Sequence, residues 1–118
     1  MSDREQLNQV LEIFVSQGYK VSGGQDDCNS CVAAALDLNE TDPYIFWTTQ
    51  DEEHAFPELY RHEFPSTEEE VFGDNFRRSG RLQISWRGAG EAITQAFRKA
   101  GFTVDWKGQL EDYIFVSK

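Results

Sequence analysis

The residues best suited to metal or redox chemistry are Cys28 and Cys31, which form a Cys-x-x-Cys pair. Two thiolates at this spacing can bind one zinc ion, and the two histidines, His54 and His62, would complete a tetrahedral set. Seven residues separate the histidines, whereas zinc motifs of this type separate them by roughly three to five. A thioredoxin-like redox pair would need a strand before the motif and a helix after it. The sequence therefore favours two unligated thiols near a helix start, and it predicts no cofactor.

Two other motifs match functional patterns only in part. Gly88 and Gly90 stand between an expected strand and an expected helix, but the third glycine of the dinucleotide-binding fingerprint is missing. Glu91 would occupy the helix N-terminus and repel an anion, so a tight turn explains the glycines better. Asp51-Glu-Glu-His54 places carboxylates beside a histidine, yet the sequence supplies no nucleophile or oxyanion donor. We therefore predict no catalytic residues.

Acidic residues are concentrated in the middle of the chain. The 118 residues carry a formal net charge of −10, and from Asp26 to Asp74 there are 14 acidic residues against one base, Arg61. Such a run forms either a solvated face or a surface that meets a basic partner. The predicted partner surface consists of six carboxylates that should be exposed and unpaired: Asp51, Glu52, Glu53, Glu68, Glu69 and Glu70.

Aromatic and basic residues accompany this acidic run. Aromatic side chains in a polar segment often anchor interfaces, so Phe56, Tyr60 and Phe64 are candidate anchors. The alternative is that they pin the segment to the protein's own core. A basic cluster follows the run, where it could hold a phosphate or neutralise the acidic residues within the fold. This cluster consists of Arg77, Arg78, Arg81 and Arg87.

A repeated helix–strand unit predicts an α+β fold. Ser2 and Glu5 have capping-box spacing, and an amphipathic helix follows them until Gly18 ends it before a short strand. Residues 14–21 align with residues 97–104, so the same unit returns near the C-terminus. We expect both helices to pack on one face of a single, mainly antiparallel sheet of about four to five strands, with two or three helices in all.

The elements between the two repeats are less regular. Residues 31–38 are predicted as a short helix, with a strand as the alternative, and β-branched and aromatic residues predict strands at 44–49 and 82–86. Residues 102–106 and 113–116 predict a final hairpin. The segment 51–81 is long for a connection, and a short capped helix is expected after Pro65. The whole chain, 1–118, is predicted as one domain.

The order of these motifs resembles an uncharacterised bacterial family of domains of unknown function. The resemblance covers roughly residues 10–117, with 51–81 poorly matched, and one departure is Val32-Ala33, where the family has Gly-His. It implies a fold and supplies no activity. The positions that carry it are Cys28, Cys31, residues 44–47, Gln50, Asp51, residues 82–86, Gly101, Val104, Trp106 and Gly108.

On these features we consider three classes of function, in order of preference. The first is a noncatalytic interaction or inhibitor module that binds a basic protein, such as a nucleic-acid-binding protein whose ligand it imitates. The second is a thiol- or zinc-dependent accessory domain centred on Cys28 and Cys31, and an enzyme is third. The negative charge opposes direct binding to nucleic acid or to anionic membrane. The chain has neither a membrane-length apolar run nor a secretory signal at its start, so a cytoplasmic location is expected.

Overall fold

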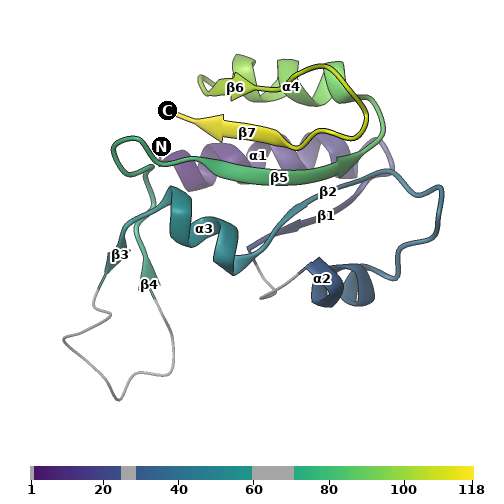
Figure 1. Cartoon of the computed structure of the whole chain (residues 1–118), viewed down its shortest axis with the longest axis horizontal. Coiled ribbons are helices and arrows are strands. Elements are labelled where there is room, and N and C mark those ends of the chain that lie inside the picture. Colours follow the sequence, from purple (N-terminus) through teal and green to yellow (C-terminus); the bar gives the residue numbers. More distant parts are fainter. Residues whose placement is uncertain (1, 25–28, 60–70) are drawn as a thin grey trace.

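The computed structural model describes residues 2–24, 29–59 and 71–118, which form four helices and two sheets (Figure 1). The helices are α1 (Asp3–Val15), α2 (Asn29–Leu36), α3 (Thr49–Ala55) and α4 (Gly90–Lys99). The strands are β1 (Lys20–Gly23), β2 (Tyr44–Trp47), β3 (Glu58–Leu59), β4 (Val71–Phe72), β5 (Leu82–Arg87), β6 (Thr103–Asp105) and β7 (Ile114–Ser117). This architecture confirms the predicted α+β class. The described residues hold four helices where two or three were predicted, because a capping box at Thr48 and Asp51 starts α3 directly after β2.

The main sheet has five strands in the order β1-β2-β5-β7-β6. β1 and β2 are parallel, and the other neighbouring strands are antiparallel. The sheet is therefore mainly antiparallel, as predicted, and it is mixed because of one parallel pair. The parallel pair has a physical cause: α2 and its flanking segments carry the chain from the end of β1 back to the start of β2. A crossover of this length, containing a helix, permits parallel pairing, whereas a tight turn does not.

One face of this sheet and two helices enclose the main core. Side chains alternate along a strand, and the strand register places Ile45, Ile84 and Ile114 on the same, inner face. The apolar stripes of α1 and α4 pack against these residues. Phe14 of α1 and Phe97 of α4, the equivalent residues of the two repeated units, are both buried in this core. The prediction that both helices share one face is confirmed.

Local signals in the sequence fix the ends of the two helix–strand units. The Ser2 hydroxyl caps α1 by accepting a hydrogen bond from the Glu5 N–H at 3.2 Å. Gly18 and Gly101 follow α1 and α4 with φ values of 92° and 99°, a left-handed conformation that favours glycine and ends a helix. The strands that follow, β1 and β6, lie at opposite edges of the sheet.

The segment between β2 and β5 holds short structure of its own. α3 follows β2 directly, and β3 pairs with β4 to form a separate two-stranded sheet that projects from the main body (Figure 1). The short helix expected around Ser66 and Thr67 lies outside the described residues. None of the helices in the described parts of the chain is long and apolar enough to cross a membrane.

Candidate functional site

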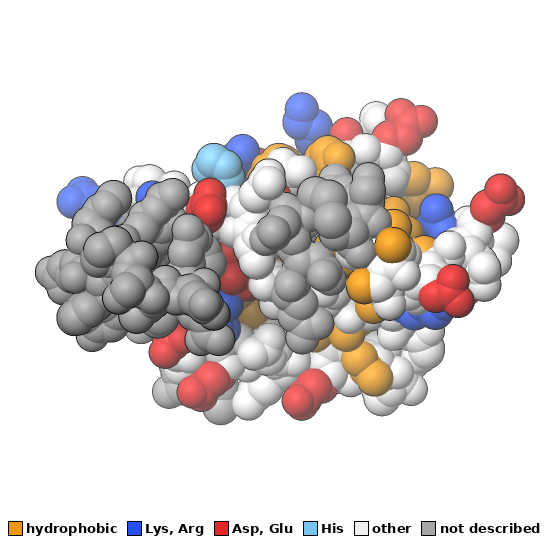
Figure 2. Space-filling view, turned by 90° about the horizontal axis from the view of Figure 1, so that it is seen from below, with side chains coloured by type: hydrophobic (Ala, Val, Ile, Leu, Met, Phe, Trp, Pro, Cys, Tyr) orange, Lys and Arg blue, Asp and Glu red, His pale blue; other side chains and the backbone are white. Residues whose placement is uncertain are grey.

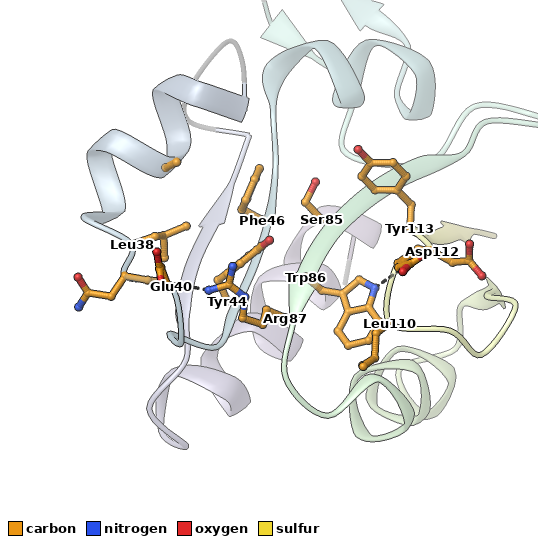
Figure 3. Close-up of a pocket in the computed structure, with 13 residues that line it drawn as sticks. Leu38, Glu40, Tyr44, Phe46, Ser85, Trp86, Arg87, Leu110, Asp112 and Tyr113 are labelled. Atoms are coloured by element: carbon orange, nitrogen blue, oxygen red, sulfur yellow. Dashed lines mark hydrogen bonds between the residues drawn. The ribbon is translucent and has the colours of Figure 1, made fainter.

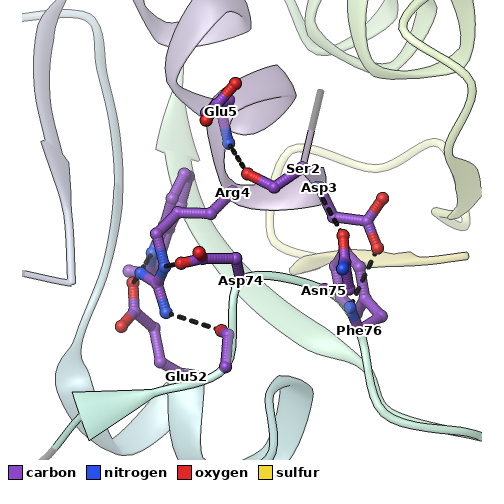
Figure 4. A network of polar contacts seen from close by, with 10 residues as sticks. Ser2, Asp3, Arg4, Glu5, Glu52, Asp74, Asn75 and Phe76 are labelled. Atoms are coloured by element: carbon purple, nitrogen blue, oxygen red, sulfur yellow. Dashed lines mark hydrogen bonds and ion pairs between the residues drawn. The ribbon is translucent and has the colours of Figure 1, made fainter.

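Glu52, one of the six carboxylates of the predicted partner surface, is buried. α3 places Glu52 against β2 and α1, where the residue is only 3% exposed. Its Oε1 accepts hydrogen bonds from Trp47 Nε1 and from Arg4 Nη1, each at 2.9 Å (Figure 4). Burial raises the pKa of Glu52, and the bonds from Trp47 and Arg4 oppose that rise. The expectation that Glu52 is exposed and unpaired is therefore wrong.

Arg4 joins Glu52 to the segment that follows β4. Its Nη2 donates to the Gly73 carbonyl oxygen at 3.3 Å, and its Nε lies 3.6 Å from Oδ1 of Asp74. The guanidinium carbon lies 4.6 Å from the centre of the Phe56 ring. Each polar group in this network has a partner within the protein (Figure 4). The network therefore holds α1, α3 and the segment after β4 together, as a structural junction.

The other members of the predicted acidic surface have different surroundings. Asp51 is half-buried, and its carboxylate accepts a hydrogen bond from the Thr48 N–H at 2.8 Å in a capping box at the start of α3. Glu53 is half-buried. The remaining members, residues 68–70, lie outside the described residues. On the face shown in Figure 2, acidic side chains of the described residues are spread out and form no single patch.

The first of the predicted aromatic anchors belongs to the core. Phe56 is 0% exposed, and its ring lies 4.8 Å from the ring of Phe76, centre to centre. It cannot anchor a partner without leaving the core, so the alternative explanation, that it pins this segment to the protein, holds for Phe56. Tyr60 and Phe64 lie outside the described residues.

The candidate metal set is described only in part. His54 is exposed in the last turn of α3, and Cys31 lies in the first turn of α2. Cys28 and His62 lie outside the described residues. Within residues 2–24, 29–59 and 71–118, no three His, Cys, Asp or Glu side chains are grouped so that they could hold a metal ion.

Two of the four clustered arginines, Arg77 and Arg87, serve separate parts of the fold. Arg77 donates hydrogen bonds to the carbonyl oxygens of Glu53 and Phe56, which lie at the end of α3. Arg87, at the end of β5, instead donates to the Asn39 carbonyl oxygen at 2.9 Å. In the parts of the chain that the structure describes, neither arginine forms an ion pair with a carboxylate of α3. These two guanidinium groups therefore bind different carbonyl oxygens and do not converge on one site.

The two glycines between β5 and α4 form a tight turn. Gly88 has a φ of 132°, and the backbone N–H of Ala89 donates to the Tyr19 hydroxyl at 2.9 Å. A Cβ on Gly90 would lie 2.7 Å from the rings of Trp86 and Trp106. The glycines thus permit close packing, and the Ala89 N–H already has a partner within the protein.

An open groove lies on the outer face of the main sheet, opposite the core (Figure 3). The register places Tyr44, Phe46 and Ser85 on this face, and they contribute to a groove with a cavity volume of about 630 Å³. α2 and the loop after it form one wall, and residues 110–113, in the loop before β7, form the other. The floor is therefore largely aromatic.

The rim of the groove is acidic. Glu40 stands on one wall and Glu111 and Asp112 on the other, and Arg87 is the one basic residue among the lining residues. Within the described parts of the chain, none of these three carboxylates forms an ion pair. The groove lining consequently carries three carboxylates against one arginine, beside the exposed ring of Tyr113, which is an arrangement suited to cations.

The loop after α2 is held in place at the edge of the groove. The Asn39 N–H donates to Oδ2 of Asp42 at 2.9 Å, and Lys20 Nζ lies 2.9 Å from the same oxygen. These contacts hold the pKa of Asp42 below its ordinary value, with the Asn39 hydrogen bond as the larger cause. Arg87 lies over the Tyr44 ring, 5.1 Å from its centre. Contacts within the protein therefore fix this wall of the groove.

Sequence reasoning missed the groove, although β2 carried a signal for it. Tyr44 and Phe46 occupy alternate positions, as do Ile45 and Trp47, so both faces of the strand are apolar. A strand with one solvated face normally alternates with polar residues. The walls, in contrast, come from residues far apart in the sequence, which no local pattern connects.

Comparisons with known protein families, with curated proteins and with solved structures found no match for this chain. The family resemblance carried by the cysteine pair and the C-terminal motif therefore stays a prediction.

Proposed function

We propose that this chain is a noncatalytic interaction module that binds a basic protein. The observation that carries the proposal is the groove on the outer sheet face, with its aromatic floor and its three carboxylates free of ion pairs within the described residues. A lysine or arginine side chain in this groove would gain both attraction to the carboxylates and contact with the rings.

The charge of the whole chain supports the same class of partner. A net charge of −10 raises the rate of encounter with a basic protein and repels nucleic acid. A partner whose lysines and arginines normally contact nucleic acid would lose those contacts while bound. The module would then act as an inhibitor that imitates nucleic acid.

A peptide of alternating lysine and glycine residues, with both termini blocked, tests the proposal. We expect it to bind the protein, as measured by calorimetry, and to bind at least about tenfold more weakly when the salt concentration is raised from about 50 to about 500 mM. Replacing the rim carboxylates in the triple variant Glu40→Gln, Glu111→Gln, Asp112→Asn should weaken binding at low salt by about tenfold or more.

A second triple variant provides the matched control. Glu5→Gln, Glu12→Gln and Glu91→Gln remove the same charge from exposed positions on α1 and α4, away from the groove. This variant should bind the lysine peptide within about twofold of the unaltered protein, because distant surface charges are screened. Equal weakening in both triple variants, or no binding by the unaltered protein, would contradict the proposal.

A further inference from the structure

The floor of the groove contains a polar group without a partner. Ser85 is only 8% exposed and lines the groove from β5, between Phe46 on β2 and the loop that carries Tyr113 (Figure 3). Its hydroxyl forms no hydrogen bond with any described residue. A hydroxyl that faces a groove without a protein partner can bond to a group that enters the groove.

The same sheet face already holds guanidinium groups against aromatic rings. Arg87 lies over Tyr44, with 5.1 Å from the guanidinium carbon to the ring centre. Arg81 lies over Phe115 in the same way, at 4.0 Å. The Phe46 side chain lines the groove beside Ser85, but it is only 5% exposed and its ring stacks on that of Tyr44, 5.3 Å apart centre to centre. Among the described residues, no arginine covers Tyr113, which lines the same groove and is 45% exposed.

We infer that the groove is a binding site for an arginine side chain of the basic partner. This inference rests on the proposed function and names the group that is recognised. The guanidinium would lie against the exposed Tyr113 ring, donate one N–H to the Ser85 hydroxyl and direct others to Asp112 or Glu111. Arginine fits better than lysine because its planar, weakly hydrated group stacks on rings and carries five donors, which can satisfy a hydroxyl and a carboxylate together.

Three peptides that differ at one position test the inference. The central lysine of the lysine–glycine peptide is replaced by arginine or by citrulline, which has the shape of arginine without its charge. We expect the arginine peptide to bind about fivefold or more tightly than the lysine peptide, and the citrulline peptide to bind most weakly. In NMR spectra of the protein, the arginine peptide should shift the backbone amide signals of Phe46, Ser85 and Tyr113.

Variants at two serines separate a specific contact from a general effect. Ser85→Ala should weaken the arginine peptide by about tenfold, because a hydrogen bond to a charged group is lost, and should change lysine-peptide binding little. The control is Ser117→Ala, which changes a half-buried serine on β7 outside the groove. This variant should bind both peptides as tightly as the unaltered protein does.

The outcomes distinguish this inference from the proposed function. If the lysine peptide binds through the rim carboxylates, but arginine gives no gain and Ser85→Ala has no effect, the arginine site is refuted and the interaction module stands. If no peptide binds, or if the NMR shifts lie away from the groove, both ideas fail together.

Discussion

Removing Arg4 should destabilise the protein in a way that depends on pH. Arg4→Met keeps much of the side chain's apolar length but leaves the Glu52 carboxylate with Trp47 as its remaining hydrogen-bond donor among the described residues. Breaking a buried ion pair by removing one member typically costs about 3–5 kcal/mol. The Arg4 side chain is 27% exposed, so water screens part of this interaction. We therefore expect a loss of about 3 kcal/mol near neutral pH.

The sign of the pH dependence follows from the pKa of Glu52. Burial raises this pKa in the folded protein, and loss of Arg4 should raise it further because an opposing positive charge is removed. The folded state then binds more protons than the unfolded state, so stability is greatest below the ordinary glutamate pKa of about 4.3. Stability is lost as the pH rises through the folded-state pKa, by at most about 1.4 kcal/mol per pH unit. The cost of Arg4→Met should therefore be smaller near about pH 5 than near about pH 7.5.

Urea denaturation followed by tryptophan fluorescence measures both effects. Arg98→Met is the matched control, because it removes one positive charge from an exposed position on α4. Adding Glu52→Gln to Arg4→Met should recover most of the lost stability, since the amide oxygen can still accept from Trp47 while the buried charge is gone. The reasoning fails if Arg4→Met costs no more than Arg98→Met, or if its cost is the same at both pH values.

Two further changes test the core and a tight backbone contact by the same urea assay. Phe97→Ala should lower the free energy of unfolding by about 3–5 kcal/mol through cavity formation, because Phe97 is buried. The control, Gln95→Ala, changes an exposed residue of the same helix and should alter the free energy of unfolding little. A loss below about 1 kcal/mol for Phe97→Ala would place Phe97 outside the core. Gly24→Ala should destabilise the protein more than Gly108→Ala, although both glycines have positive φ. A Cβ on Gly24 would meet the Glu52 carboxylate at 2.0 Å, whereas a Cβ on Gly108 would meet nothing within 4 Å. Equal losses of stability would contradict this prediction.

Local patterns in the sequence determined most of the secondary structure. The capping residue Ser2, the helical spacing of apolar residues and the glycines at positions 18 and 101 predicted both units that became α1-β1 and α4-β6. The short helix α2, strands β2 and β5 and the final hairpin were predicted as well. These predictions succeed because capping, periodicity and glycine conformation depend on residues a few positions apart.

The tertiary structure alone decided which residue of the acidic run at 51–53 is buried. Asp51, Glu52 and Glu53 are adjacent and chemically alike, so no sequence pattern separates them. In α3 successive side chains point about 100° apart, and the packing of this helix against β2 and α1 turns Glu52 inward to Trp47 and Arg4.

The groove likewise depends on contacts that are distant in the sequence. Its walls hold Glu40 and Asp112, and its floor holds Phe46 and Ser85 from neighbouring strands. Their proximity follows from the order β1-β2-β5-β7-β6 and from the register of its strands. Strand order is set by the free energy of burying the whole inner face, which no single segment encodes.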